Sequence, residues 1–334
     1  MIKAILRTGY FIRMLFIILW ISALCDASGQ NTPEYLKYYS YEQVINPAAT
    51  GRDRYPFVNF SNKKYWLSTR NSPYEICLGG AFRLGHINFY TPTMMLNKYN
   101  FFSRDRMGFG GFLMYEQNGP MGYLFTEFSY GYHIPLNENS TTELSFGLSL
   151  QLSDYNINTN MLDPMDSGDP ELLALEKVPP VFDGGFGVYF NTEQFFAGAS
   201  ANDLLRTEYD LETDITEPNR RDIFLQSGYK FYLHRFELEP SILGAWIDDD
   251  PLYFSGQLKA YYKDYNWISI GYMSTQSMRL AAGLRVGRIH FVYAFEQSIS
   301  KMAKYFSNSH EIMIGLNIGL FEPKGLRKTV RRRP

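Results

Sequence analysis

The feature of this sequence that most constrains its fold is a regular alternation of apolar and polar residues. Between Glu143 and Ser153, leucine or phenylalanine occupies every second position, and Glu, Ser, Gly or Gln occupies the positions between them. Successive side chains of a β-strand point to opposite faces, so this segment predicts a strand with one apolar and one polar face.

The same period of two recurs along the chain. It returns within residues 222–231, 252–262, 279–286, 289–296 and 311–320. Together with weaker candidates, these segments predict about 14 strands, an even number as in bacterial single-chain barrels. The predicted strands span residues 55–66, 74–84, 106–116, 121–134, 142–155, 181–190, 194–202, 222–233, 235–247, 251–262, 265–274, 278–287, 289–297 and 309–321.

These strands have the composition of a membrane-spanning barrel. Their polar positions are rich in Gly, Ser, Gln and charged residues, which suits a wet or crowded lumen, while the apolar positions suit lipid. Lipid offers no hydrogen-bond partner to a free strand edge, so such a sheet must close. We therefore expect an all-β protein, a closed antiparallel transmembrane β-barrel with both termini in the periplasm.

The N-terminus is typical of a cleaved signal peptide. Basic residues precede the apolar run from Met14 to Leu24, and the small residues Ala27 and Gly29 follow it. The run is shorter than a transmembrane helix, which needs about 20 apolar residues. The predicted organisation is a signal peptide at 1–29, a periplasmic segment at 30–54, the outer-membrane barrel at 55–322 and a basic periplasmic tail at 323–334.

The two cysteines exclude a disulfide-built fold. Cys25 lies in the predicted signal peptide, and its acylation is an alternative, although Leu24 stands where a lipoprotein signal has a small residue. Cys77 alone then remains, so no intramolecular disulfide can form. Its apolar surroundings predict a packed or lipid-facing thiol rather than a nucleophile.

The sequence offers little support for catalysis. The five histidines stand apart, and no metal-binding or nucleophile motif occurs. A Ser–His pair assembled on a barrel wall remains the one enzymatic alternative. The net charge of −2 lacks the basic surplus of a nucleic-acid binder. We expect no enzyme, no cofactor, no metal and no nucleic-acid partner.

Two long connections carry clusters of carboxylates. Residues 156–180 and 203–221 both connect strands at the end away from the termini, as does 298–308. We hypothesise that the two acidic loops form a rim that binds a partner protein; solvated loops, or a calcium site in the first loop, are the alternatives. The residues concerned are Asp163, Asp166, Asp169, Glu171, Glu208, Asp210 and Glu212.

The connection at 87–102 breaks the pattern of short turns at the other end. It either folds into the lumen or contains a strand pair that the alternation does not reveal.

Two stretches resemble the PorP/SprF family of Bacteroidota outer-membrane proteins. The stretches are PEYLKYYSYEQVINPAATG near the N-terminus and YAFEQSISKMAKYFSNSHEIMIGL near the C-terminus. The chain departs from the family at the first strand, where it keeps Trp66 and Pro73 without the full Arg-Gln-Trp pattern, and in continuing past the last strand. The positions that match the family pattern are Tyr38, Asn46, Pro47, Ala48, Gly51, His310, Glu311 and Ile312.

The resemblance implies a role with the type IX secretion system. Family members are associated with secretion or surface attachment of proteins that carry a C-terminal sorting domain, and some serve gliding adhesins. The implied partners are outer-membrane lipid and lipopolysaccharide, such a cargo protein, and periplasmic subunits of the system. The alternatives are a channel or transporter for a small solute and a soluble β-sandwich.

Two terminal segments keep two interpretations each. The region of Asn46 and Pro47 either bends the chain into the first strand or belongs to a plug of the lumen. The basic tail is either disordered or contacts anionic lipid or an acidic subunit.

Overall fold

The computed structural model describes residues 41–53, 55–66, 72–84, 104–137, 141–158, 179–205, 221–233, 236–247, 252–262, 266–299 and 308–318. The predicted signal peptide, Tyr38 and the basic tail lie outside these residues. The strands are β1 (Phe57–Lys64), β2 (Tyr74–Arg83), β3 (Met107–Asn118), β4 (Met121–Pro135), β5 (Glu143–Ile157), β6 (Val181–Asn191), β7 (Phe195–Asn202), β8 (Asp222–Tyr229), β9 (Phe231–Leu233), β10 (Phe236–Ile247), β11 (Tyr253–Tyr262), β12 (Asn266–Met273), β13 (Ser277–Val286), β14 (Ile289–Ser298) and β15 (Ser309–Asn317).

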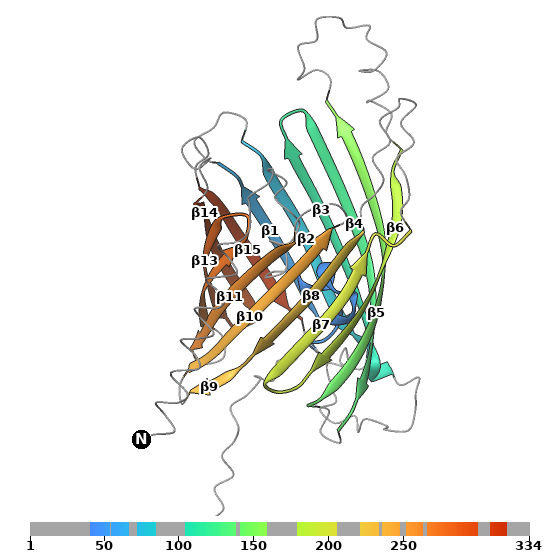
Figure 1. The fold of residues 1–334 in the computed structure, drawn as a ribbon, viewed down its shortest axis with the longest axis vertical. Coiled ribbons are helices and arrows are strands. Elements are labelled where there is room, and N and C mark those ends of the chain that lie inside the picture. Colours follow the sequence, from blue (N-terminus) through green and yellow to red (C-terminus); the bar gives the residue numbers. More distant parts are fainter. Residues whose placement is uncertain are drawn as a thin grey trace, which may run out of the picture.

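The strands form a closed antiparallel ring (Figure 1). Each strand pairs with its neighbours in the chain, except that β8 and β9 both pair with β10 and not with each other. The ring closes where β1 pairs with β15, from Phe57 opposite Asn317 to Lys64 opposite His310. Counted with β8 and β9 as one interrupted strand, the ring has 14 strands, so the predicted barrel is confirmed. The end where β1 begins and β15 ends is called the terminal end below, and the opposite end is called the far end.

The predicted strand at 222–233 is interrupted. Lys230 belongs to neither β8 nor β9, although both strands pair with β10 in one continuous register, with Gly228 opposite Ser241 and Phe231 opposite Leu238. That register places Glu239 opposite Lys230 and Pro240 opposite Tyr229, the last residue of β8. Proline has no backbone N–H to donate, so Pro240 weakens the hydrogen-bond ladder beside the interruption.

The alternating apolar residues face outward, as predicted. Leu148 and Leu150 on β5 are 58% and 55% exposed, whereas Ser145 and Gln151 on the same strand are buried inside the ring. This burial pattern is the inverse of a soluble protein's, and it suits a strand with lipid on one face and a packed lumen on the other. A soluble β-sandwich would bury the leucine row between two sheets.

Aromatic rings gather on the outer surface near the terminal end. Phe82, Phe109 and Tyr130 lie on adjacent strands, with ring centroids 5.8 and 5.3 Å apart. Phe236 and Tyr262 pair in the same way at 5.4 Å. Rings in this position are typical of the girdle of a membrane barrel at one interface. Within the described residues, no helix is long and apolar enough to cross a membrane.

The lumen contains apolar residues that alternation alone does not assign to the inside. Cys77, Phe112, Met114 and Phe125 on β2, β3 and β4 are buried and pack in one cluster that includes Tyr41. The Cys77 thiol is thus packed inside the barrel, which is one of its two predicted environments.

The long predicted loops connect strands at the far end. They lie between β5 and β6, between β7 and β8, and between β14 and β15. Most of their residues, including all the carboxylates of the hypothesised rim, lie outside the described residues, as does the stretch 87–102.

Candidate functional site

The lumen holds the chain segment that precedes the barrel. Residues 41–53, called the luminal segment below, form the short helix α2 (Glu42–Ile45) and the 3-10 turn η2 (Pro47–Ala49). Figure 1 shows them as a blue coil enclosed by the strands. Asn46, Ala48 and Thr50 are completely buried there. The barrel lumen is therefore occupied, not empty, at this level.

Local sequence shapes the turn inside the segment. The Asn46 side chain accepts a hydrogen bond from the backbone N–H of Ala48 at 3.0 Å, and Pro47 occupies the first position of the turn. The first N–H groups of a helical turn have no backbone hydrogen-bond partner within the turn. An asparagine cap accepts a hydrogen bond from one of them, and proline at the first position has no N–H that would need a partner. The Asn-Pro-Ala sequence is thus a turn-forming unit.

The same asparagine attaches the segment to the barrel wall. Its amide nitrogen lies 3.1 Å from the carbonyl oxygen of Val188 on β6 and 3.4 Å from that of Ala199 on β7. Asn46 therefore joins the turn to two adjacent strands through one side chain.

Polar wall residues hold the backbone on both sides of that point. Ser200 on β7 donates to the carbonyl of Ile45 at 2.6 Å, and His133 Nε2 on β4 lies 2.8 Å from the carbonyl oxygen of Thr50. The other ring nitrogen of His133 lies 2.7 Å from Ser145 Oγ. Buried backbone carbonyls need such partners, and here the wall supplies them.

Glycines in the wall make room for this contact. A Cβ added to Gly147 on β5 would lie 2.1 Å from the backbone nitrogen of Ala48, and one added to Gly187 on β6 would lie 2.0 Å from Asn46 Oδ1. No side chain tolerates such distances, so the segment and the wall fit only because these positions lack a Cβ. Gly51, within the segment itself, has a φ of +76°.

An ion pair closes the segment on itself. Arg52 and Glu42 approach to 2.6 Å, and the Tyr189 hydroxyl of β6 donates to Glu42 Oε1 at 2.8 Å while also bonding Arg52. The pair is about a fifth exposed on each side, so its contribution to stability is modest. It nevertheless fixes both ends of the segment to the same wall residue.

An apolar cluster lies in the lumen at the start of the segment. Tyr41 and Val44 pack on Phe112 from β3 and reach Val292 on β14 and Met313 on β15. These strands lie on one side of the ring, whereas Ile45 packs with Phe224 on β8 and Leu243 on β10 across from them, so the segment itself joins the two sides. Tyr41 also donates from its hydroxyl to Ser61 Oγ on β1 at 3.2 Å.

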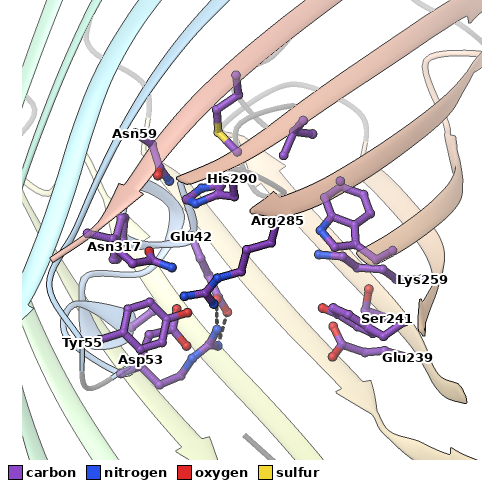
Figure 2. A pocket seen from close by; sticks show the side chains of 18 of the residues that line it. Glu42, Asp53, Tyr55, Asn59, Glu239, Ser241, Lys259, Arg285, His290 and Asn317 are labelled. Atoms are coloured by element: carbon purple, nitrogen blue, oxygen red, sulfur yellow. Dashed lines mark hydrogen bonds and ion pairs between the residues drawn. The ribbon is translucent and has the colours of Figure 1, made fainter. Parts of the chain in front are cut away.

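Beside the segment the lumen widens into a cavity of about 370 Å³ (Figure 2). Its boundaries include Asn191 and Asn317, the last residues of β6 and β15 at the terminal end. The wall of the cavity comes mainly from β10 to β15. Its side chains include Tyr55, Glu239, Lys259, Trp267, Arg285 and His290.

Charged side chains dominate this cavity. Lys230 pairs with Glu239 at 3.2 Å and with Glu237 at 3.5 Å. Lys259 lies over the Trp267 ring at 4.0 Å and the Tyr261 ring at 5.0 Å from the centroids. These side chains are long and flexible, in contrast to the glycines on the opposite wall.

Tyr55 brings a hydroxyl to the cavity from the turn before β1. The nearby Asp53 carboxylate and burial raise the pKa of Tyr55 above its ordinary value, despite the opposing charge of Arg285. The hydroxyl therefore stays protonated at physiological pH and can donate a hydrogen bond.

The structure separates the family-motif residues into two places. Asn46, Pro47, Ala48 and Gly51 all lie in the luminal segment. His310, Glu311 and Ile312 lie on β15. There, Glu311 pairs with Arg279 at 2.6 Å inside the barrel, His310 bonds the Tyr293 hydroxyl at 2.7 Å, and Ile312 faces outward.

Other predicted site residues lie outside the described residues. They are Tyr38, Asp163, Asp166, Asp169, Glu171, Glu208, Asp210 and Glu212. The cavity residues were not expected from the sequence. Among the described residues, no three His, Cys, Asp or Glu side chains gather as a metal site would require.

Comparison with known proteins gives one match over most of the chain. A family model described as "Type IX secretion system membrane protein PorP/SprF" matches residues 27–316. No curated protein matches the sequence.

Solved structures with a similar arrangement are distant in sequence. The toluene transporter TbuX of Ralstonia pickettii is 11% identical, with 82% of this chain and 92% of that chain covered and a TM-score of 0.48. The monoaromatic hydrocarbon channel CymD is 11% identical, with 88% of this chain and 94% of that chain covered and a TM-score of 0.49. The toluene transporter TodX of Pseudomonas putida is 9% identical, with 86% of this chain and 93% of that chain covered and a TM-score of 0.45. Similarity at this level does not indicate a shared substrate.

Proposed function

Because this chain belongs to the PorP/SprF family of type IX secretion system membrane proteins, we propose that it is a non-catalytic outer-membrane barrel that binds or anchors proteins handled by that system. The cargo is a protein with a C-terminal sorting domain, either secreted or held at the cell surface, with gliding adhesins as one class. Periplasmic subunits of the system are further partners. The family is one of secretion-system membrane barrels and not an enzyme class.

The observation that carries this proposal is the occupied lumen. A channel needs a continuous open path, whereas a docking or anchoring barrel does not. Here the luminal segment lies in direct contact with β5 and β6 at Gly147 and Gly187, and its apolar residues pack on both sides of the ring, Tyr41 with the cluster on β2 to β4 and Ile45 with the cluster on β8 and β10. Both features support a barrel whose partners bind at its ends and not one that passes solutes through its centre.

The far end is our proposed site of cargo attachment. It carries the two acidic loops, at 156–180 and 203–221, whose carboxylates would attract a basic surface on a partner. With the termini in the periplasm and the signal peptide removed on export, these loops face the outside of the cell. The solute channel remains the alternative, and it differs in predicting steady ion conductance.

Deletion of residues 159–176 tests the attachment site. We expect the deleted barrel to insert and to keep its heat-modifiable mobility in gels, because the loop follows β5 and precedes β6 without belonging to either. Cargo attachment, measured by surface labelling of a protein with a C-terminal sorting domain, should be lost.

The matched control is deletion of residues 300–307 at the same end. That loop contains Lys301 and Lys304 and no carboxylate, so cargo attachment should survive its removal. Normal attachment after deletion of 159–176, or equal loss after either deletion, would refute the acidic rim. A third variant with Asp163, Asp166, Asp169 and Glu171 changed to Asn or Gln separates charge from loop length.

A further inference from the structure

Two lysines inside the barrel lie over aromatic rings but differ in their partners. Lys63 on β1 lies 4.4 Å from the Tyr65 ring centroid and also pairs with Glu296 at 3.0 Å. Lys259 on β11 lies 4.0 Å from the Trp267 ring centroid, yet it forms no ion pair with any residue of the described ranges. A luminal cation is normally paired, so the second arrangement is the unusual one.

The carboxylates of the cavity are already engaged. Glu42 is held by Arg52 and Tyr189, and Glu237 and Glu239 are both held by Lys230. Neither these three acids nor Asp53, the fourth carboxylate of the cavity, forms an ion pair with Lys259. The Lys259 ammonium instead points into the open volume, where Arg285 also extends from β13 (Figure 2).

The remaining walls provide an apolar surface. Trp267, Val292 and Met313 line the cavity on the side of the apolar cluster. Binding sites for small molecules are typically concave, mostly apolar and roughly 300–1,000 Å³ in volume, with a few polar groups that fix orientation. The cavity, at about 370 Å³, is at the small end of that range.

From this geometry we propose that the cavity binds a carboxylate attached to a small apolar body. The carboxylate lies between Lys259 and Arg285, and the body packs against Trp267 and Met313. Ammonium and guanidinium groups form charge-assisted hydrogen bonds with carboxylates, which are stronger than neutral ones. The bound carboxylate supplies the partner that the chain itself does not give Lys259. The site is independent of the proposed cargo role, which depends on the far end.

The test compares an acid with its uncharged amide. The mature chain in nanodiscs is titrated with phenylacetate and with phenylacetamide at about 0.15 M salt, where non-specific charge effects are screened, and empty nanodiscs provide the blank. We expect saturable binding of phenylacetate and binding of phenylacetamide that is weaker by about tenfold or more. Equal affinity for the two probes would overturn the proposal.

Variants assign the binding to this cavity. Lys259→Gln should weaken phenylacetate binding by about tenfold or more, whereas Lys259→Arg should retain it. Lys63→Gln is the matched control, since it removes the other ring-stacked lysine and should leave the affinity unchanged. Unchanged binding in a folded Lys259→Gln barrel would overturn the assignment. If that variant does not fold, the comparison of phenylacetate with phenylacetamide on the unmodified chain still tests whether the barrel binds a carboxylate.

Competition identifies the source of the carboxylate. The tripeptide Ala-Ala-Phe with a free C-terminus and its C-terminal amide are each added to the phenylacetate complex. Displacement by the free peptide alone assigns the site to peptide C-termini. Displacement by neither peptide, with phenylacetate still bound, assigns it to small organic acids.

Discussion

The two sides of the lumen differ in how they meet the luminal segment. On the side of β4 to β7, glycines and short polar residues bring the wall into direct contact with the segment. On the side of β10 to β14, long charged side chains surround a cavity of about 370 Å³. The same ring of hydrogen-bonded strands provides both walls, so the difference arises from the size and charge of the side chains.

Because of this difference, we expect the glycine-rich wall to contribute mainly to the stability of the barrel and the charged wall mainly to ligand binding. Contacts that hold the segment are concentrated on the glycine-rich wall, where close packing leaves no space for a larger side chain. The charged wall contributes few contacts to the segment, and its side chains have room to reorient around a ligand. Substitutions of the same kind should therefore have different effects on the two walls.

The largest effect is expected for Gly147→Val. Its side chain would overlap the backbone of Ala48, which a shift of a flexible side chain cannot relieve. We expect a loss of about 3 kcal/mol or more in the free energy of unfolding, measured by urea denaturation with gel mobility as readout. Gly256→Val is the control, because a Cβ there meets nothing within 4 Å. Equal stability of the two variants would show that the close contact between Gly147 and the luminal segment does not stabilise the barrel.

A smaller effect is expected for Asn46→Ala. The substitution leaves the carbonyls of Val188 and Ala199 without the amide that reaches them and removes the cap of Ala48. The expected loss is about 2 kcal/mol in the same assay. Asn62→Ala, on the exposed side of β1, should change the stability by less than about 0.5 kcal/mol. A loss no greater for Asn46→Ala than for Asn62→Ala would show that the segment is not held at this point.

The finest comparison uses one serine from each wall. Ser200 donates to the carbonyl of Ile45 at 2.6 Å, whereas Ser241 only lines the cavity. Ser200→Ala should cost about 1 kcal/mol, because it leaves the buried Ile45 carbonyl with only the long hydrogen bond from Asn202 at 3.5 Å. Ser241→Ala should stay within about 0.5 kcal/mol of the unmodified chain. The reverse order would contradict the division between the two walls.

The sequence predicted the ring because the alternation is a local property. Each outward row, such as that from Leu144 to Leu152, is visible within one strand, and lipid enforces it at every second residue. The predicted strand ends lie within two residues of the observed ones, except the end of the last strand, which was predicted at residue 321 and lies at Asn317. The interruption at Lys230 was missed because Pro240, which lies opposite the adjacent Tyr229, is on the neighbouring strand and is brought there only by the register.

The interior was harder to predict because it is assembled across the ring. Cys77, Phe112 and Met114 lie in segments where both phases are apolar or small, so alternation does not say which phase faces inward. The cavity joins Lys259, Arg285 and the luminal segment, and their proximity depends on closure of the barrel and not on any local motif. The Asn-Pro-Ala sequence was recognisable, but its attachment to β6 and β7 was not.

Ion conductance in planar bilayers tests the central claim most directly. The luminal segment packs against both sides of the ring through Tyr41 and Ile45, and we propose that it closes the barrel. We predict that the mature chain gives no steady conductance, and that a variant lacking residues 31–53 does, because the deletion removes the segment and leaves the strands of the ring in place. Steady conductance from the intact chain would contradict the account and favour the solute channel.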